Sequence, residues 1–300
     1  MAKSMKTEYI NVHGGFVTLS TLGDCHDAVP VLYIHGGPGG NNSSFMPMAE
    51  KLAENRIVYM YNQLGGDETG HMGDEELWDP ERYIDSLGDL IAALKVDRLH
   101  VIGRSWGGYL AAEYLLRSGK TPIISLTMTS PFLSTPLWIA DAKLRLAELG
   151  EDVVKIVEEC EGSTFFDNVT YQNIIRRYND TYQCRNDQIS HLGNPYFTKA
   201  VRTKTAAGME VYRHMWGPSE FTSTGIMKDL DITGRMKDIK IPVLLLIGEY
   251  DQVSQKTCEY YRSLIPGSRM AIIPDASQTQ FLENFDRFYW TFCNFIVNVE

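Results

Sequence analysis

Short apolar runs alternate with longer amphipathic stretches through the first 133 residues of the chain. Runs rich in β-branched and aromatic residues predict strands, and apolar positions spaced three and four apart predict helices. The alternation in Tyr9–Val12 and Gly15–Thr21 predicts an opening hairpin. The alternation of strands and helices along the chain indicates a mostly parallel sheet with helices on both faces. Its other elements are expected at Val29–Ile34, Ile57–Tyr61, Leu99–Gly103 and Ile123–Ser130 (strands) and at Pro80–Leu94 (helix).

The pattern changes between residues 134 and 235, where we find no convincing buried strand. Helical spacing predicts an inserted helical cap there, with helices at Trp138–Leu149, Glu151–Cys160, Tyr171–Gln183 and Tyr196–Met215. Alternation then resumes, with strands at Pro242–Gly248 and Met270–Ile273 and helices at Lys256–Leu264 and Phe285–Val297. We therefore expect a core made of residues 1–133 and 236–300, and a cap made of residues 134–235.

Composition narrows the class of function. The 300 residues are 44% hydrophobic and 22% charged, which is ordinary for a globular protein. The formal net charge of −10 disfavours nucleic acid or an anionic membrane as a partner, because both need a basic surface. Five widely spaced cysteines without a CxxC pair argue against a disulfide framework or a zinc site. We expect a reducing, cytoplasmic location, since neither a signal peptide nor a membrane span is evident.

The segment Gly103–Gly108 (GRSWGG) indicates a nucleophile. It lies between the apolar run Leu99–Ile102 and the helical stretch Tyr109–Leu116. A serine on a tight, glycine-flanked turn from strand to helix is typical of a nucleophile elbow. Ser105 is therefore the candidate nucleophile.

A glycine-rich loop, His35–Gly40 (HGGPGG), follows the strand Val29–Ile34. A phosphate cradle is the weaker interpretation, because the loop lacks the Lys-Ser/Thr of a P-loop and is not GxGxxG. Beside an elbow, a backbone amide of Gly36 or Gly37 together with that of Trp106 fits an oxyanion hole.

An acidic residue completes the order expected of a triad. Asp251 follows the strand Pro242–Gly248. In folds that carry such an elbow, the chain order is Ser, then Asp, then His, and the acid stands after a late strand. Asp251 is therefore the candidate triad acid.

Seven motifs cover almost the whole chain, from about residue 31 to residue 290. They are His35–Gly39 (HGGPG), Tyr61–Gly65 (YNQLG), Gly103–Gly108 (GRSWGG), Trp216–Phe221 (WGPSEF), Thr224–Asp231 (TGIMKDLD), Gly248–Asp251 (GEYD) and Pro274–Asn284 (PDASQTQFLEN). Through them the chain resembles the proline iminopeptidase (prolyl aminopeptidase) family of serine peptidases. The resemblance implies an α/β-hydrolase core with a helical cap, and removal of an N-terminal residue, often proline, from short peptides.

The resemblance also implies roles for individual residues. Ser105 would be the nucleophile, Asp251 the triad acid, and Glu220 the group that binds the substrate's α-ammonium by charge-assisted hydrogen bonds. The expected partner is a small peptide or aminoacyl amide, and no metal or organic cofactor is implied. The other residues placed at the substrate are Trp216, Trp106, Gln252 and Glu249.

The sequence departs from the family at the catalytic histidine, which the family carries in a PDASH motif. Gln278 stands there instead, and His191 and His214 lie in the predicted cap. Glutamine cannot take up and return a proton near neutral pH. Loss of a triad histidine costs on the order of 10⁶ in turnover, roughly 8 kcal/mol of barrier. Asn62 and Gln252 also replace acidic residues of the family.

Two hypotheses stay open. In the first, the chain is an aminopeptidase or amidase whose Ser105 would form an acyl-enzyme, impaired because Gln278 replaces histidine, either naturally or by engineering. In the second, it is a natural non-hydrolytic homologue that binds a peptide-like ligand or catalyses cyclisation or acyl transfer. A purely structural role is weaker, because it gives no reason to keep both an elbow and an oxyanion loop.

Overall fold

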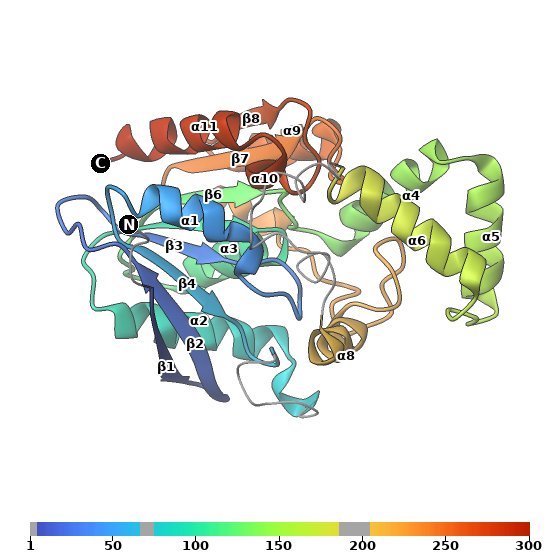
Figure 1. Ribbon diagram of the computed structural model, residues 1–300, viewed down its shortest axis with the longest axis horizontal. Helices are drawn as coiled ribbons and strands as arrows, with labels where there is room; N and C mark the ends of the chain where they lie inside the picture. The colour runs from blue at the N-terminus through green and yellow to red at the C-terminus, as the bar shows by residue number, and fades with distance from the viewer. Residues whose placement is uncertain (1–4, 67–74, 186–204) are drawn as a thin grey trace.

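The computed structural model describes residues 5–66, 75–185 and 205–300, which form an eight-stranded sheet with flanking helices (Figure 1). The strands lie in the order β1-β2-β4-β3-β5-β6-β7-β8. Every strand predicted from the hydropathy pattern is present, with ends shifted by a few residues. The strands are β1 (Lys6–Val12), β2 (Gly15–Leu22), β3 (Val31–Ile34), β4 (Val58–Asn62), β5 (Leu99–Arg104), β6 (Ile123–Thr129), β7 (Val243–Gly248) and β8 (Arg269–Ile273).

Pairing within the sheet is mostly parallel. The hairpin β1–β2 is antiparallel and β2 pairs antiparallel with β4, whereas all further neighbours are parallel. Because parallel strands share one direction, their carboxyl ends meet at one edge of the sheet, where ligands bind in open α/β folds. The chain leaves that edge at His35, Ser105, Ser130 and Asp251.

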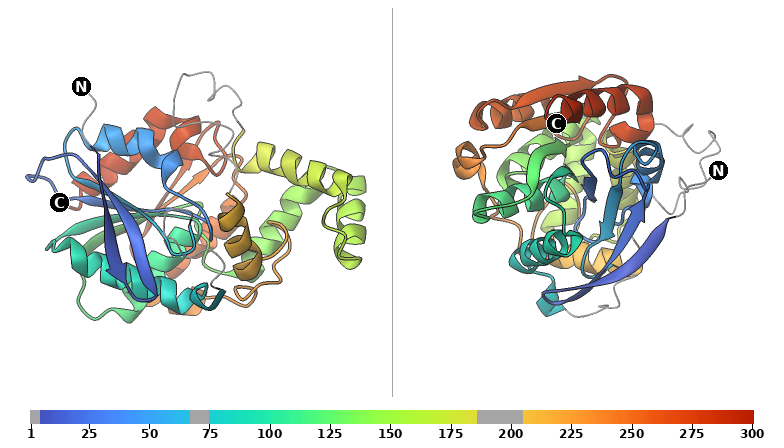
Figure 2. Two further views of the ribbon diagram at one scale, coloured as in Figure 1. Left: turned by 60° about the horizontal axis from the view of Figure 1, so that its bottom comes forward. Right: turned by 90° about the vertical axis from the view of Figure 1, so that its left-hand side faces the viewer.

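Helices cover both faces of the sheet, as predicted (Figure 2). One face is closed by three helices and the other by α1, α10 and α11, and each set shares a hydrophobic cluster with the strands. The helices of the first face are α2 (Pro80–Leu94), α3 (Trp106–Arg117) and α9 (Gln255–Leu264). Those of the second are α1 (Met46–Leu52), α10 (Gln280–Glu283) and α11 (Phe285–Val297).

Strand β7 contributes to both hydrophobic clusters. Val243, Leu245 and Ile247 pack into the cluster under α2, α3 and α9. Leu244 and Leu246 pack into the opposite cluster. Successive side chains of a strand point to opposite faces, so a fully apolar strand buries both sides of a central sheet.

The chain between β6 and β7 is mostly helical and lies beyond the carboxyl edge of the sheet (yellow-green to gold in Figure 1). The first three helices share a hydrophobic cluster of their own. Of the predicted helix Tyr196–Met215, the part before residue 205 lies outside the described residues. The division into core and cap at residues 134 and 235 stays a prediction. These helices are α4 (Thr135–Glu148), α5 (Glu151–Gly162), α6 (Val169–Tyr182) and α8 (Ala206–Met215).

Several short elements were not predicted from the sequence. They have too few residues to show a helical period of apolar positions. They are α1, α10 and the 3₁₀ turns η1 (Ser43–Phe45), η2 (Glu75–Leu77) and η4 (Thr233–Asp238).

Candidate active site

Ser105 occupies the sharp turn between β5 and α3. Its backbone angles, φ 48° and ψ −115°, are rare for a residue with a side chain. Its amide donates to the Thr129 carbonyl at 2.9 Å. The turn closes because a Cβ on Gly103 would lie only 2.5 Å from the Gly107 oxygen, and one on Gly107 would overlap the Ile34 carbonyl. The segment GRSWGG thus forms a strained strand–turn–helix that holds a mostly buried serine.

Gln63 joins the loop after β3 to the start of α3. Its Nε2 donates to the His35 carbonyl at 2.8 Å, and its Oε1 accepts from Trp106 Nε1 at 3.0 Å. Its backbone amide donates to His35 Nε2 at 3.1 Å, and His35 Nδ1 lies 2.7 Å from the Gly36 carbonyl. Burial lowers the pKa of His35 to about 4, so the ring is neutral and carries its proton on Nδ1. His35 therefore has a structural role, because its ring joins Gln63 to the glycine-rich loop after β3.

The candidate oxyanion loop packs on the elbow. A Cβ placed on Gly36 would lie 3.2 Å from the Arg104 carbonyl oxygen and 3.6 Å from the Cβ of Ser105, so the loop lies directly against the elbow. Gly37 has a φ of 157°. Trp106 is the first residue of α3, and the first amides of a helix have no carbonyl partner within it. The amides of Gly36, Gly37 and Trp106 thus belong to two segments that meet at Ser105.

Asp251 is completely buried, and every hydrogen bond to its carboxylate comes from a neutral group. Its Oδ2 accepts from Ser130 Oγ at 2.7 Å, from Gln280 Nε2 at 2.8 Å and from the Gly248 amide at 3.1 Å. Its Oδ1 accepts from the Val253 amide at 3.2 Å. Burial raises the pKa of Asp251 to about 6, although these four hydrogen bonds favour the charged form.

Gln278 hydrogen-bonds Arg104 through its side-chain amide, which within the described residues does not bond Asp251. Its Oε1 accepts from Arg104 Nη2 at 3.1 Å, and its backbone amide donates to the Tyr182 carbonyl at 3.1 Å. His214 lies 3.6 Å from Glu75, and His191 is outside the described residues. Within the described part of the chain, no histidine hydrogen-bonds the Asp251 side chain, so no Ser-His-Asp relay forms there.

Glu220 lies half-buried in a group of polar side chains. Tyr212 donates to its Oε1 at 2.8 Å, and Gln252 Nε2 donates to its Oε2 at 3.4 Å. Among the residues that the structure describes, the buried Oε1 of Gln252 accepts no hydrogen bond and the buried hydroxyl of Tyr178 has no partner. Burial, with Glu220 as the next cause, raises the pKa of Tyr178 and Tyr212, so both hydroxyls stay neutral. An unpaired acceptor beside a carboxylate suits an ammonium group.

The other two residues predicted at the substrate differ in their placement. Trp216 is buried next to this group, donates from Nε1 to the Ser219 carbonyl at 2.7 Å, and meets the Phe132 ring edge-on. Glu249 is exposed, and its Oε2 accepts from the Asp275 amide at 3.1 Å. The structure therefore brings Trp216 to Glu220 and leaves Glu249 at the surface.

Four site residues were missed from the sequence: Arg104, Ser130, Gln280 and Gln63. The sequence offered signals for Gln63, which stands in the YNQLG motif, for Gln280, which stands in the PDASQTQFLEN motif, and for Arg104, which directly precedes Ser105. Asn62 of the same motif accepts from the Asn42 amide at 3.1 Å, so it braces the chain after the oxyanion loop.

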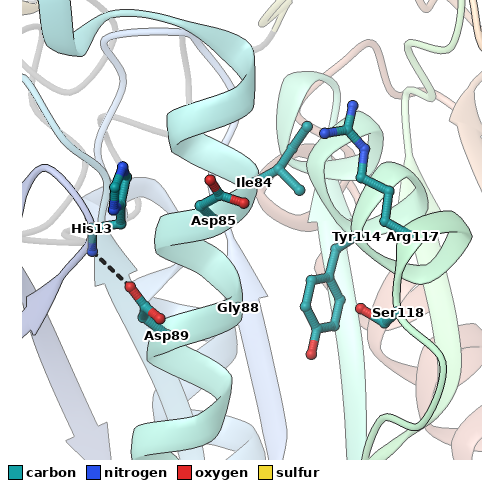
Figure 3. Close-up of a pocket in the computed structure, with 8 residues that line it drawn as sticks. All are labelled: His13, Ile84, Asp85, Gly88, Asp89, Tyr114, Arg117 and Ser118. Carbon is teal, nitrogen blue, oxygen red and sulfur yellow. Dashed lines mark hydrogen bonds between the residues drawn. The ribbon is translucent and has the colours of Figure 1, made fainter.

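A surface depression lies at the far end of α3 from Ser105. Two of its charged side chains already have partners, since Arg117 bonds Glu81 and Glu113, and Asp89 accepts from the His13 amide at 2.6 Å. It offers no better candidate site. Its lining is formed by His13, Ile84, Asp85, Gly88, Asp89, Tyr114, Arg117 and Ser118 (Figure 3).

The described residues contain no group of three or more His, Cys, Asp or Glu side chains that is placed to hold a metal ion. They also contain no helix with the length and apolar character needed to cross a membrane.

Comparison with known proteins gives consistent matches. A family model described as alpha/beta hydrolase fold matches residues 29–285. The proline iminopeptidase of Heyndrickxia coagulans is 31% identical over 296 residues, which is 98% of this chain and 100% of that protein. The proline iminopeptidase of Clostridium botulinum is 26% identical over 271 residues, 89% of each chain.

Solved structures agree on the fold. The proline iminopeptidase of Mycobacterium smegmatis superposes with a TM-score of 0.85 at 26% identity, covering 98% of each chain. VinJ superposes with a TM-score of 0.88 at 23% identity, covering 98% of this chain and 99% of its own. At that identity, the likeness to VinJ shows the fold alone.

Proposed function

The chain belongs to the α/β-hydrolase fold and, within it, to the proline iminopeptidase family, and from this premise we propose that it binds the amino-terminal end of a small peptide or aminoacyl amide. In this proposal the hydrolase scaffold is kept, while turnover through a Ser-His-Asp triad is lost. The helices α4, α5, α6 and α8, with the segment that follows α8, act as the cap that carries the ammonium site. The five free cysteines support a reducing, cytoplasmic location.

The observation that carries the proposal is the unpaired acceptor beside Glu220. A buried oxygen without a donor costs roughly 1–3 kcal/mol. The Oε1 of Gln252 is such an oxygen, and its own Nε2 already donates to Glu220. An ammonium group has three donors and no acceptor, so it would satisfy both Gln252 and Glu220 at once.

The surroundings of Asp251 support the loss of triad turnover. A triad acid needs a free oxygen to receive the Nδ1–H of its histidine. Here Ser130, Gln280 and Gly248 already donate to Oδ2, so an imidazole could reach only Oδ1, which accepts from the Val253 amide. Replacing the family's histidine by Gln278 would not by itself create the hydrogen bond from Gln280 to Asp251. We therefore favour natural divergence of the site over a single engineered change.

A second candidate, acyl transfer or cyclisation, is favoured by the strained backbone of Ser105. Such strain costs on the order of 1–3 kcal/mol, and it is commonly kept where the residue is used. Ser105 Oγ would bond the acyl carbon as the bond to the leaving group breaks, and the leaving group would take the serine proton. An acceptor amine would then displace Ser105 and return a proton to it.

Binding of matched amides tests the proposal. We expect L-alaninamide or L-prolinamide to bind, as measured by titration calorimetry, and N-acetyl-L-alaninamide to bind about tenfold more weakly or worse, because it has no ammonium group. Neither amide should be hydrolysed. Equal binding of the acetylated and free amides would overturn the proposal, and an acyl-enzyme on Ser105 in mass spectrometry with aminoacyl p-nitrophenyl esters would favour the second candidate.

A further inference from the structure

Arg104 directly precedes Ser105 and has no carboxylate partner among the described residues, whereas several other arginines of the molecule are paired with one. Arg56 pairs with Glu300, Arg145 with Glu148, and Arg117 and Arg235 with Glu113. No ion pair of Arg104 is found among residues 5–66, 75–185 and 205–300. The chain as a whole carries a net charge of −10, so an unneutralised cation directly before Ser105 needs its own explanation.

The Arg104 side chain is half-buried and held in place by neutral groups. Its Nη2 donates to Gln278 Oε1 at 3.1 Å and lies 3.5 Å from Thr279 Oγ1. Its guanidinium carbon lies 5.7 Å from the centre of the Phe281 ring, and its Nε is shielded from solvent and has no acceptor among the described residues. A ligand anion would therefore have to bind at the Nη groups, of which Nη1 makes no hydrogen bond within the described part of the chain.

The contact with Gln278 places the charge on one side of Ser105. Gln278 occupies the position of the family's general acid, and a general acid stands beside the leaving group of the scissile bond. Arg104 therefore lies toward the leaving-group side, whereas Glu220 serves the ammonium end. In a dipeptide, the terminal carboxylate follows the amide nitrogen by a single carbon.

We propose that Arg104 binds the carboxylate of a ligand whose ammonium group is bound at Glu220, so that the preferred ligands are zwitterionic dipeptides or equivalent aminoacyl amino acids. This inference rests on the proposed ammonium site. The planar fork of Arg104 matches a carboxylate in a bidentate fashion, which a lysine would not reproduce.

A ligand series with one variant and one control tests it by titration calorimetry at neutral pH. The ligands are L-alanyl-L-alanine, its C-terminal amide, and N-acetyl-L-alanyl-L-alanine. We expect the dipeptide to bind wild type about tenfold more tightly than its amide. Arg104→Gln should abolish this preference, whereas Arg262→Gln, which removes an exposed charge on α9, should keep it.

The outcomes separate the two proposals. Equal binding of dipeptide and amide, with weak binding of the acetylated ligand, overturns the role of Arg104 and leaves the ammonium site standing. Tight, Arg104-dependent binding of the acetylated dipeptide supports Arg104 and overturns the ammonium site. Absence of binding by every ligand overturns both. If Arg104→Gln does not fold, the role of Arg104 is tested with two other measurements. These are the preference of the wild type for the dipeptide over its amide, and the same preference in Arg104→Lys, where it should be reduced.

Discussion

Gln280 Nε2 donates a hydrogen bond of 2.8 Å to Oδ2 of Asp251, the carboxylate of the candidate triad acid. The same Nε2 lies 2.9 Å from Ser130 Oγ, which itself donates to Asp251 at 2.7 Å. The acid is thus satisfied by residues that cannot relay a proton near neutral pH. Gln278, two residues earlier, turns to Arg104. Among the described residues, no imidazole contacts this carboxylate.

Gln278→His alone should restore little hydrolysis of prolyl and alanyl amides. The new imidazole would find Asp251 occupied by Gln280, and its protonated form would face Arg104. Two like charges about 4 Å apart near a protein surface repel by about 4 kcal/mol. Adding Gln280→Ala and Arg104→Ala should raise turnover over the single variant by about 100-fold or more.

Steady-state release of the N-terminal residue measures that turnover. Ser105→Ala in the triple variant is the control and should remove the gain. Full recovery in Gln278→His alone would mean that the site is an intact peptidase lacking one side chain.

Glu220→Gln should weaken binding of L-alaninamide by about tenfold or more, because a charged partner of the ammonium is lost. Glu249→Gln is the matched control and should change the affinity little, since Glu249 is exposed and bonds the Asp275 amide. Calorimetric titration of both variants gives the comparison. A larger effect at Glu249 would place the ammonium site elsewhere.

Asp251 should make stability depend on pH below neutrality. Its pKa is raised from 3.8 to about 6, so the folded state holds this proton more tightly than the unfolded state. The resulting stabilisation is complete below pH 4 and is lost as the pH rises through 6. Relative to Asp251→Asn, the wild-type free energy of unfolding should fall by up to about 3 kcal/mol over that interval. Urea unfolding at several pH values measures the difference, and a flat difference would contradict the shift.

Gln63→Leu should destabilise the fold by roughly 2–4 kcal/mol. It removes the partners of the His35 carbonyl and of Trp106 Nε1, and each buried group left unpaired costs about 1–3 kcal/mol. Gln255→Leu is the control, because Gln255 bonds only the exposed Glu259 on the surface of α9. Chemical denaturation of the two variants should differ clearly, and similar midpoints would argue against the bridging role of Gln63.

Ser105→Gly should stabilise the protein, whereas Ser105→Ala should not. Glycine adopts a φ of 48° and ψ of −115° without a Cβ penalty, so it should gain on the order of 1 kcal/mol. Alanine keeps the penalty and serves as the control for loss of the hydroxyl. Thermal unfolding of both variants provides the test. A midpoint for Ser105→Gly below that of the wild type would contradict strain at the elbow.

The sequence predicted features that depend on local spacing. The apolar run of β7 and the glycines around Ser105 act within a few neighbouring residues, so strand, turn and helix followed from the pattern. The hydrogen bond from Gln280 to Asp251 did not follow from the pattern, because the two residues are 29 positions apart in the sequence. Which glutamine reaches the acid depends on the turn after β8, where Asp275 has a φ of 53°. No hydrophobic period encodes that turn.

Phe221, which follows Glu220, packs into the hydrophobic cluster of α4, α5 and α6, whereas Ser105 and Asp251 are fixed to strands of the sheet. Under the proposed function, the ammonium end of a ligand would be held by Glu220, which is also bonded by Tyr212 of the main core cluster and by Gln252 after β7. We therefore expect local opening of the three helices to weaken the hold on this end, and so to shorten the residence time of the ligand, without unfolding the sheet.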